Sequence, residues 1–123
     1  MTNQPSLFDV APPDPLMHNA LAERNRLANI DNIAHACMSW ADQAFPTRTD
    51  ASMFLKMYGE LAELIDAKED CSDEIADILI LVLDYAARKG IKPSAAVLTK
   101  LNVNRQREWE FTNIGTMQHV KNP

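Results

Sequence analysis

Apolar residues recur at helical spacing along the chain, and this pattern predicts four helices. The first predicted helix covers about residues 15–44 and ends at Phe45-Pro46, because proline cannot continue a helix. Its apolar positions are Leu27, Ile30, Ile33, Ala34, Cys37, Met38 and Ala41. The second begins near Asp50, a good N-cap residue, and continues to about Lys68. Its buried face is predicted to contain Met53, Met57, Leu61, Leu64 and Ile65.

The third predicted helix, about residues 73–89, is apolar on nearly all sides, which is typical of a central helix or of one at an oligomer interface. The loop before it, residues 69–72, is short and favours an antiparallel hairpin with the second helix. The fourth helix is predicted to begin after Lys92-Pro93, with Ser94 as its cap, and to extend to about Trp109. No segment carries a clear strand signal. The pattern therefore predicts an all-α bundle of about four helices whose core is completed by oligomerisation.

The chain of 123 residues has the length of one domain. Residues 1–15 contain four prolines and little periodicity, so we interpret them as a flexible arm. Residues 16–110 form the predicted all-α domain, and residues 111–123 are left as a tail without a clear period.

Charge and cysteine content narrow the functional classes. The net charge is −5, which argues against broad binding of nucleic acids or anionic membranes. The start of the chain has no signal-peptide pattern, and the most apolar segment, residues 75–87, is too short and too acidic to span a bilayer. Cys37 and Cys71 lack zinc-site spacing and are expected to be reduced thiols. These features predict a cytoplasmic protein without membrane or direct nucleic-acid contacts.

Two acidic pairs stand on the second and third predicted helices: Glu60-x-x-Glu63 and Glu74-x-x-Asp77. Residues three apart project from the same side of a helix, so in a hairpin all four carboxylates converge. An exposed acidic face is the ordinary alternative for one such pair. Four carboxylates at close quarters repel one another unless cations hold them, and one pair here lies in an apolar helix. The pattern predicts a site for Mg²⁺, the usual partner of nucleotide phosphates.

A cationic stripe is predicted on the fourth helix, where Lys100, Asn104 and Arg107 fall on one side. Two cations and an amide suit phosphate oxygens, although alone such a stripe is more often a solvated face. Lys56, one turn before Glu60, is included among the candidate substrate-binding residues. Carboxylates that bind metal and a separate cationic stripe together favour a polyphosphate substrate.

Both motifs resemble those of a known family. The run MYGELAELIDAKEDCSDEIADILILVLDYAARKG resembles the central hairpin of the MazG-like, all-α nucleoside triphosphate pyrophosphohydrolases, and KLNVNRQREW resembles their later K-x-x-x-N-x-x-R element. The resemblance covers roughly residues 30–110 and implies conversion of nucleoside triphosphates to monophosphates and pyrophosphate. It assigns Mg²⁺ or Mn²⁺ to the four acids, and phosphate contacts to Lys100, Asn104 and Arg107.

Three details resemble the phage-associated, MazZ-type branch, which acts on purine deoxynucleotides. Ten residues separate Glu63 from Glu74, Asp84 follows Asp77 by seven residues, and the segment after Trp109 is similar. This resemblance implies dGTP or dATP as substrate and adds Asp84 to the candidate substrate-binding residues.

The alternatives are a dUTP- or dCTP-type pyrophosphatase of the same fold and a non-catalytic helical interaction module. A di-iron bundle is disfavoured because no Glu is followed by His three residues later.

Four further expectations complete the sequence interpretation. The nucleophile predicted for hydrolysis is a water activated by the metal, and Glu63 is our candidate for the general base that accepts its proton. Trp40 is a candidate for stacking on the base, although an aromatic residue near a helix end is more often part of the core. Gln4-Pro5-Ser6-Leu7-Phe8 resembles peptides that bind the bacterial sliding clamp. We expect a homodimer or homotetramer, since the flanks of so apolar a third helix need covering.

Overall fold

The computed structural model describes residues 19–22, 24 and 29–121. Its elements are α2 (Ile30–Ala44), α3 (Asp50–Asp66), α4 (Ser72–Arg88), α5 (Pro93–Gln106), β1 (Trp109–Phe111) and β2 (Met117–His119). Residues 19–22 and 24 are helical as well. The predicted all-α class is confirmed, whereas the proline-rich arm and the clamp-like peptide Gln4–Phe8 lie outside the described residues.

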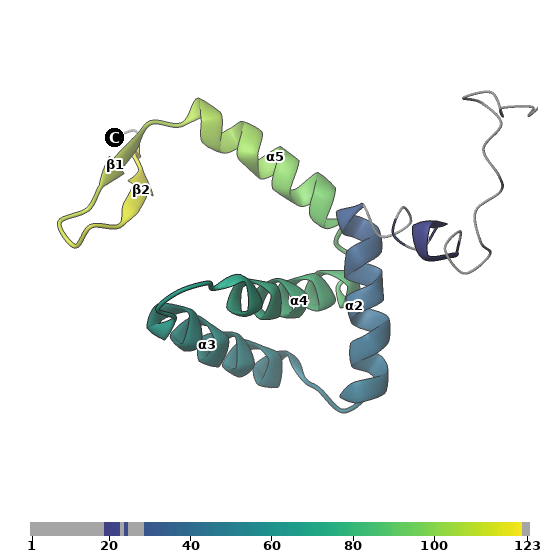
Figure 1. The fold of residues 1–123 in the computed structure, drawn as a ribbon. Helices are drawn as coiled ribbons and strands as arrows, with labels where there is room; N and C mark the ends of the chain where they lie inside the picture. Colours follow the sequence, from purple (N-terminus) through teal and green to yellow (C-terminus); the bar gives the residue numbers. More distant parts are fainter. Residues whose placement is uncertain (1–18, 23, 25–28, 122–123) are drawn as a thin grey trace, which may run out of the picture.

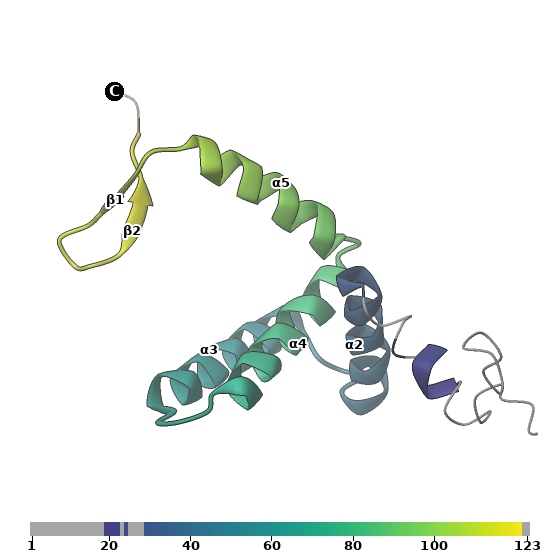
Figure 2. The ribbon, with the colours of Figure 1, turned by 45° about the horizontal axis from the view of Figure 1, so that its top comes forward.

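Helix α4 is the central element of the bundle. It packs against both α2 and α3, and α3 and α4 form an antiparallel hairpin that α2 crosses (Figure 1). Helix α5 touches α2 near its own N-terminus and then leads away from the hairpin, with the two strands at its far end (Figures 1 and 2). Of the two places predicted for the most apolar helix, the centre of the bundle or an oligomer interface, the contacts within the chain support the central one.

The prediction of one continuous helix over about residues 15–44 was wrong, because α2 begins as a separate helix at Ile30, after the N-cap Asn29. The backbone of Asn29 is extended (φ −91°, ψ 132°), and its side chain accepts a hydrogen bond from the backbone N–H of Asp31 at 2.7 Å. An asparagine side chain satisfies a free helix N–H group in this way. A local cap therefore outweighs the apolar spacing that suggested a longer helix.

The cap of α3 is also one residue away from the predicted one. Thr49 is the N-cap, and its side chain and that of Ser52 bond each other's backbone N–H groups at 3.1 and 2.8 Å. This reciprocal pair is a capping box in which serine takes the place usually held by Glu or Gln. Asp50, the predicted cap, is instead the first residue of the helix and is free to bind cations from α4.

Asp31 anchors α5 to α2. Ser94 donates its backbone N–H to Asp31 Oδ1 at 2.9 Å and its hydroxyl to Asp31 Oδ2. The N-terminal N–H groups of a helix have no partner within the helix, so a carboxylate from elsewhere can satisfy one of them. The prediction of Ser94 as the cap was wrong: Lys92 is the N-cap and makes no side-chain cap bond, while Ser94 lies inside the first turn and is held from α2.

The C-terminal segment forms a β-hairpin, which the sequence did not predict. Helix α5 ends at Gln106, and the two strands pair with Trp109 opposite His119 and Phe111 opposite Met117. Gly115 (φ 81°) takes the left-handed conformation that the turn needs. Strands of three residues are too short for their alternation to stand out, so the predicted boundary between residues 110 and 111 falls inside β1.

The core of the described residues is small. Its buried apolar side chains are Ala34, Ala41, Met53 and Leu83. Many large apolar side chains on α3 and α4 stay exposed: Phe54, Leu55, Tyr58, Leu61, Ile65, Ile75, Leu79, Ile80 and Val82. Because so many apolar side chains contact water, one face of the α3–α4 hairpin is uncovered within a single chain.

Among the described residues, no helix combines the length and the apolar character needed to cross a bilayer.

Candidate active site

Three carboxylates meet between α3 and α4. Glu60 is only 5% exposed, Glu63 follows one turn later on α3 and is exposed, and Asp77 approaches from α4. The hairpin brings them together because each lies on the side of its helix that borders the other helix. We call Glu60, Glu63 and Asp77 the carboxylate cluster.

The charges within the carboxylate cluster perturb one another. Lys56 places its Nζ 3.0 Å from Glu60 Oε1 and holds the pKa of Glu60 below its usual value, and the nearby Glu63 and Asp77 act in the same direction. The Glu60 carboxylate in turn raises the pKa of Glu63, an effect to which burial and Asp77 add. Like charges at short range produce this splitting, in which one acid ionises more readily and its neighbour less readily.

Two carboxylate oxygens on the α3–α4 hairpin are buried without a hydrogen-bond partner: Oε2 of Glu60 on α3 and Oε2 of Glu74 on α4. Burying an unpaired carboxylate oxygen is costly, so such atoms suit a ligand that brings positive charge. Carboxylate oxygens are the donors that Mg²⁺ and Mn²⁺ prefer, and the chemistry of the donor set therefore fits these ions. Within the described residues, no three acidic, histidine or cysteine side chains already form a cation-binding geometry.

The cationic stripe lies apart from the carboxylate cluster within one chain. Lys100 is exposed, Asn104 and Arg107 are half-buried, and Asn104 Oδ1 is a further buried atom without a partner. Trp109 Nε1 donates to the backbone oxygen of Asn104 at 2.9 Å and ties the β-hairpin to the end of α5. Because α5 leads away from α3 and α4, this chain does not bring the two predicted halves of the site together (Figure 2).

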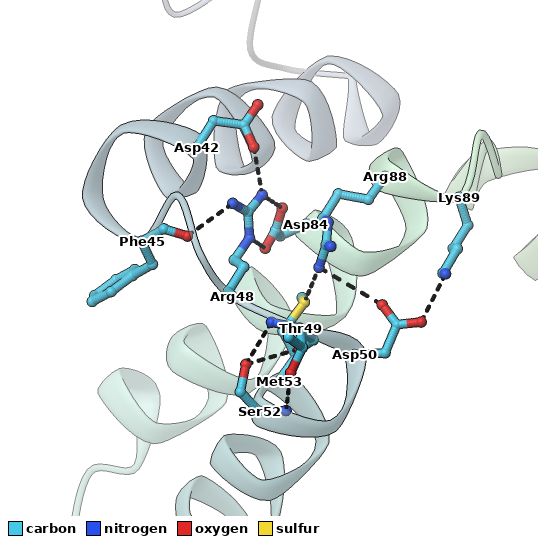
Figure 3. A network of polar contacts seen from close by, with 10 residues as sticks. All are labelled: Asp42, Phe45, Arg48, Thr49, Asp50, Ser52, Met53, Asp84, Arg88 and Lys89. Carbon is cyan, nitrogen blue, oxygen red and sulfur yellow. Dashed lines mark hydrogen bonds and ion pairs between the residues drawn. The ribbon is translucent and has the colours of Figure 1, made fainter.

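Asp84 has a partner that sequence analysis missed. Its side chain is 2% exposed and receives two hydrogen bonds from Arg48, which lies in the loop between α2 and α3. The same guanidinium also bonds Asp42 and the backbone oxygen of Phe45 (Figure 3). The available signal was an acid inside an apolar helix, which requires a cation. The structure thus gives Asp84 a structural contact, and its assignment to the substrate remains a prediction.

A second set of contacts joins the start of α3 to the end of α4. Lys89 donates to Asp50 at 2.7 Å, and this bond is the main reason that the pKa of Asp50 lies below its usual value. Arg88 lies 3.8 Å from the other Asp50 oxygen and donates to the sulfur of Met53 (Figure 3). Together with Arg48, these residues hold the helices that carry the carboxylate cluster.

Trp40 lies on the surface of α2. Its side chain is 55% exposed and makes an edge-to-face contact with Phe45, with 5.6 Å between the ring centroids. Stacking on a base remains a prediction for this residue.

A separate apolar cavity of about 310 Å³ opens along α3 and α4, and it is lined by Phe54, Met57, Tyr58, Leu61 and Ile78.

Comparisons with known proteins agree with this architecture. No protein-family model matches the chain. A dATP/dGTP diphosphohydrolase of Salmonella phage PMBT28 is 41% identical over 91 residues, which cover 74% of this chain but only 31% of that protein. A dATP/dGTP diphosphohydrolase of Cyanophage S-2L is 33% identical over 95 residues, or 76% of this chain and 90% of that protein. This chain thus spans under a third of the Salmonella phage relative and nearly the whole of the cyanophage one.

A solved structure supports the same assignment. The Cyanophage S-2L MazG-like pyrophosphohydrolase, bound to dGDP and three catalytic Mn²⁺ ions per active site, superposes with a TM-score of 0.68 at 32% identity. The match covers 76% of this chain and 93% of that one. The kinship predicted from the two motifs is therefore confirmed. Since identity above 30% extends over nearly the whole cyanophage protein, this chain belongs to the MazG-like pyrophosphohydrolases, in the phage group that includes dATP/dGTP diphosphohydrolases.

Proposed function

We propose that this chain is a metal-dependent enzyme that hydrolyses a purine deoxynucleoside triphosphate, dATP or dGTP, to the monophosphate and pyrophosphate. The observation that carries the proposal is Glu60, a buried carboxylate with one unpartnered oxygen, beside Glu63 and Asp77 on the hairpin. The purine preference is supported by the two phage relatives and by the dGDP in the cyanophage structure.

The residues that would hold the divalent cations are Glu60, Glu63, Glu74 and Asp77. When bound, Mg²⁺ or Mn²⁺ supplies positive charge to the triphosphate and lowers the pKa of the attacking water. The chain itself supplies oxygen donors on two helices that are braced against each other, so that the donors keep their spacing during the reaction. Mn²⁺ in the cyanophage structure supports a divalent cofactor of this kind.

Glu63 is the proposed general base. Its neighbour Glu60 raises its pKa, and a carboxylate with a raised pKa accepts a proton more readily. In the proposed reaction the water oxygen bonds to the α-phosphorus, the bond from this phosphorus to the bridging oxygen breaks, and pyrophosphate leaves. The water proton passes to Glu63. Lys56, Lys100, Asn104 and Arg107 are proposed to contact the phosphates, while Trp40 and Asp84 stay candidates for the nucleoside.

A homodimer or homotetramer is part of the proposal, because one chain lacks a complete site. Helix α5 contains no acidic residue and carries Lys100 and Arg105, which complement the acidic hairpin in charge. The exposed apolar face of α3 and α4 needs a cover of comparable character. A second copy provides both, by placing its α5 near the carboxylate cluster of the first. As a cytoplasmic enzyme, such an oligomer would meet its nucleotide directly.

The test is a panel of the common NTPs and dNTPs with Mg²⁺ or Mn²⁺, with products resolved by chromatography. We expect monophosphate and pyrophosphate from dATP or dGTP, and none from the chelator-treated enzyme. Orthophosphate release would contradict the reaction, and a preference for dUTP or dCTP would favour the pyrimidine alternative. A non-catalytic helical module would turn over nothing, and Mn²⁺ would not raise its melting temperature.

A further inference from the structure

We propose that Lys56 is a built-in counter-ion of the carboxylate cluster, which divalent cations displace from Glu60 when they bind. The inference rests on the proposed metal-dependent function and deepens it. In the metal-free protein, Lys56 is then a positioning residue that acts through Glu60. It neutralises this carboxylate before cations arrive, and its ammonium becomes free for nucleotide phosphates afterwards.

The contact between the two side chains is direct. Lys56 Nζ lies 3.0 Å from Oε1 of Glu60, four residues later on α3. The Glu60 side chain is 6% exposed, and its second oxygen, Oε2, has no hydrogen-bond partner. A single ammonium thus neutralises one oxygen of a buried carboxylate and leaves the other unpaired. The buried group still has capacity for a cation that contacts it more fully.

The Lys56 side chain can leave this position easily. Its side chain is 64% exposed, so the ammonium can turn into water without disturbing packed residues. An exposed lysine contact is weak, because the ammonium is well hydrated and holding it costs side-chain entropy. A divalent ion carries twice the charge and can take oxygens from several carboxylates at once. Glu63 and Asp77 add their charge to the same place and favour the divalent ion further.

Competition of this kind has a measurable signature. When a ligand can bind only while its site is free, its apparent affinity is the intrinsic affinity multiplied by the fraction of time for which the site is free. If Lys56 contacts Glu60 for most of the time, removing the ammonium therefore makes cation binding tighter. A residue that helped to hold the cation, or that only supported the fold, would not have this effect. The sign of the change therefore separates the roles.

The experiment measures Mn²⁺ binding to the nucleotide-free full chain by titration calorimetry, together with the melting temperature with and without Mn²⁺. We expect Lys56→Met to bind Mn²⁺ about three- to tenfold more tightly than the unmodified protein. Its metal-free melting temperature should fall, and the deficit should disappear at saturating Mn²⁺. Lys56→Gln removes the charge but keeps a polar side chain, and serves in its place if Lys56→Met does not fold.

Two controls isolate the contact. Lys68→Met removes the same charge at the exposed end of the α3–α4 loop and should leave the Mn²⁺ affinity within about twofold, because exposed charges at a distance are screened. Lys56→Arg keeps the competing cation and should bind Mn²⁺ no more tightly than the unmodified protein. Equal gains from Lys56→Met and Lys68→Met would overturn the proposal, since net charge alone would then explain the result.

The remaining outcomes separate this proposal from the proposed function. If Lys56→Met binds Mn²⁺ more weakly or equally well, and the unmodified chain releases pyrophosphate, the counter-ion role alone is overturned. Tighter binding in a protein that hydrolyses no nucleotide supports the counter-ion role and overturns the function. A protein that binds no Mn²⁺ overturns both.

Discussion

Arg48 holds Asp84 at both carboxylate oxygens, with Nε 2.9 Å from Oδ2 and Nη2 2.8 Å from Oδ1. The two residues are 36 positions apart in the chain, and both side chains are almost completely buried. A planar guanidinium matches a carboxylate in this way, with two parallel hydrogen bonds. The pair joins the loop before α3 to the C-terminal half of α4, and so fixes the helices that carry the carboxylate cluster.

Removing Arg48 should destabilise the fold. Arg48→Met leaves Asp84 charged and unpaired in the interior, and such a loss typically costs about 3–5 kcal/mol. Urea denaturation of the metal-free protein measures the change. Asp42→Asn removes the exposed partner of the same guanidinium and should cost below about 1 kcal/mol. The double variant Arg48→Met/Asp84→Leu should recover much of the loss; no recovery would mean that the pair is not the source of the stability.

Glu60 should be essential for cation binding. Glu60→Gln replaces the buried carboxylate that we propose to hold the cation by a neutral amide of the same shape, and we expect activity to fall by about 10- to 100-fold. The increase in melting temperature on adding Mn²⁺ should disappear as well. Glu69→Gln, in the exposed loop between α3 and α4, serves as the matched control and should behave as the unmodified protein. A Glu60→Gln variant that keeps the Mn²⁺ response would show that the site lies elsewhere.

Complementation between two inactive variants tests the shared site. If the carboxylates come from one copy and the cationic stripe from another, a mixture of Glu60→Gln and Arg107→Ala chains contains some unmodified sites. Random assortment in a dimer makes half of the dimers mixed, each with one intact site in two, so about a quarter of the activity should return. Co-refolding at equal ratio, followed by a pyrophosphate assay, measures it. No recovery in mixed oligomers would place both halves in the same chain.

The anchor of α5 should depend on pH through Asp31. Hydrogen bonds from the Ser94 hydroxyl and backbone N–H hold the pKa of Asp31 below its usual value. A carboxyl group whose pKa is lower in the folded state stabilises the fold above its unfolded pKa, and this contribution is lost as the pH falls through the folded value. Asp31→Asn should therefore increase amide exchange at Ser94 near pH 7. The difference should shrink as the pH falls through the folded-state pKa of Asp31, which lies below the usual aspartate range, and a pH-independent difference would contradict this origin.

Sequence pattern alone predicted the parts of this protein that depend on neighbours along the chain. The α3–α4 hairpin follows from apolar spacing and a short loop, and the placement of Glu60 and Glu63 on one side of α3 follows from helical geometry. The family resemblance rests on the same local motifs. These features were predictable because contacts between residues three or four apart hardly depend on the rest of the fold.

The tertiary structure decided the contacts between distant residues that lie outside this hairpin motif. It paired Arg48 with Asp84, held Ser94 from Asp31, and turned α5 away from the hairpin, none of which has a periodic signal. It also divided the acids into a buried Glu60 beside Lys56 and an exposed Glu63, although both belong to one motif. The sequence by itself determined which residues carry charge and on which side of a helix they lie. Burial and the choice of partner depend on how the helices pack, and that packing decides which of these charges must be compensated.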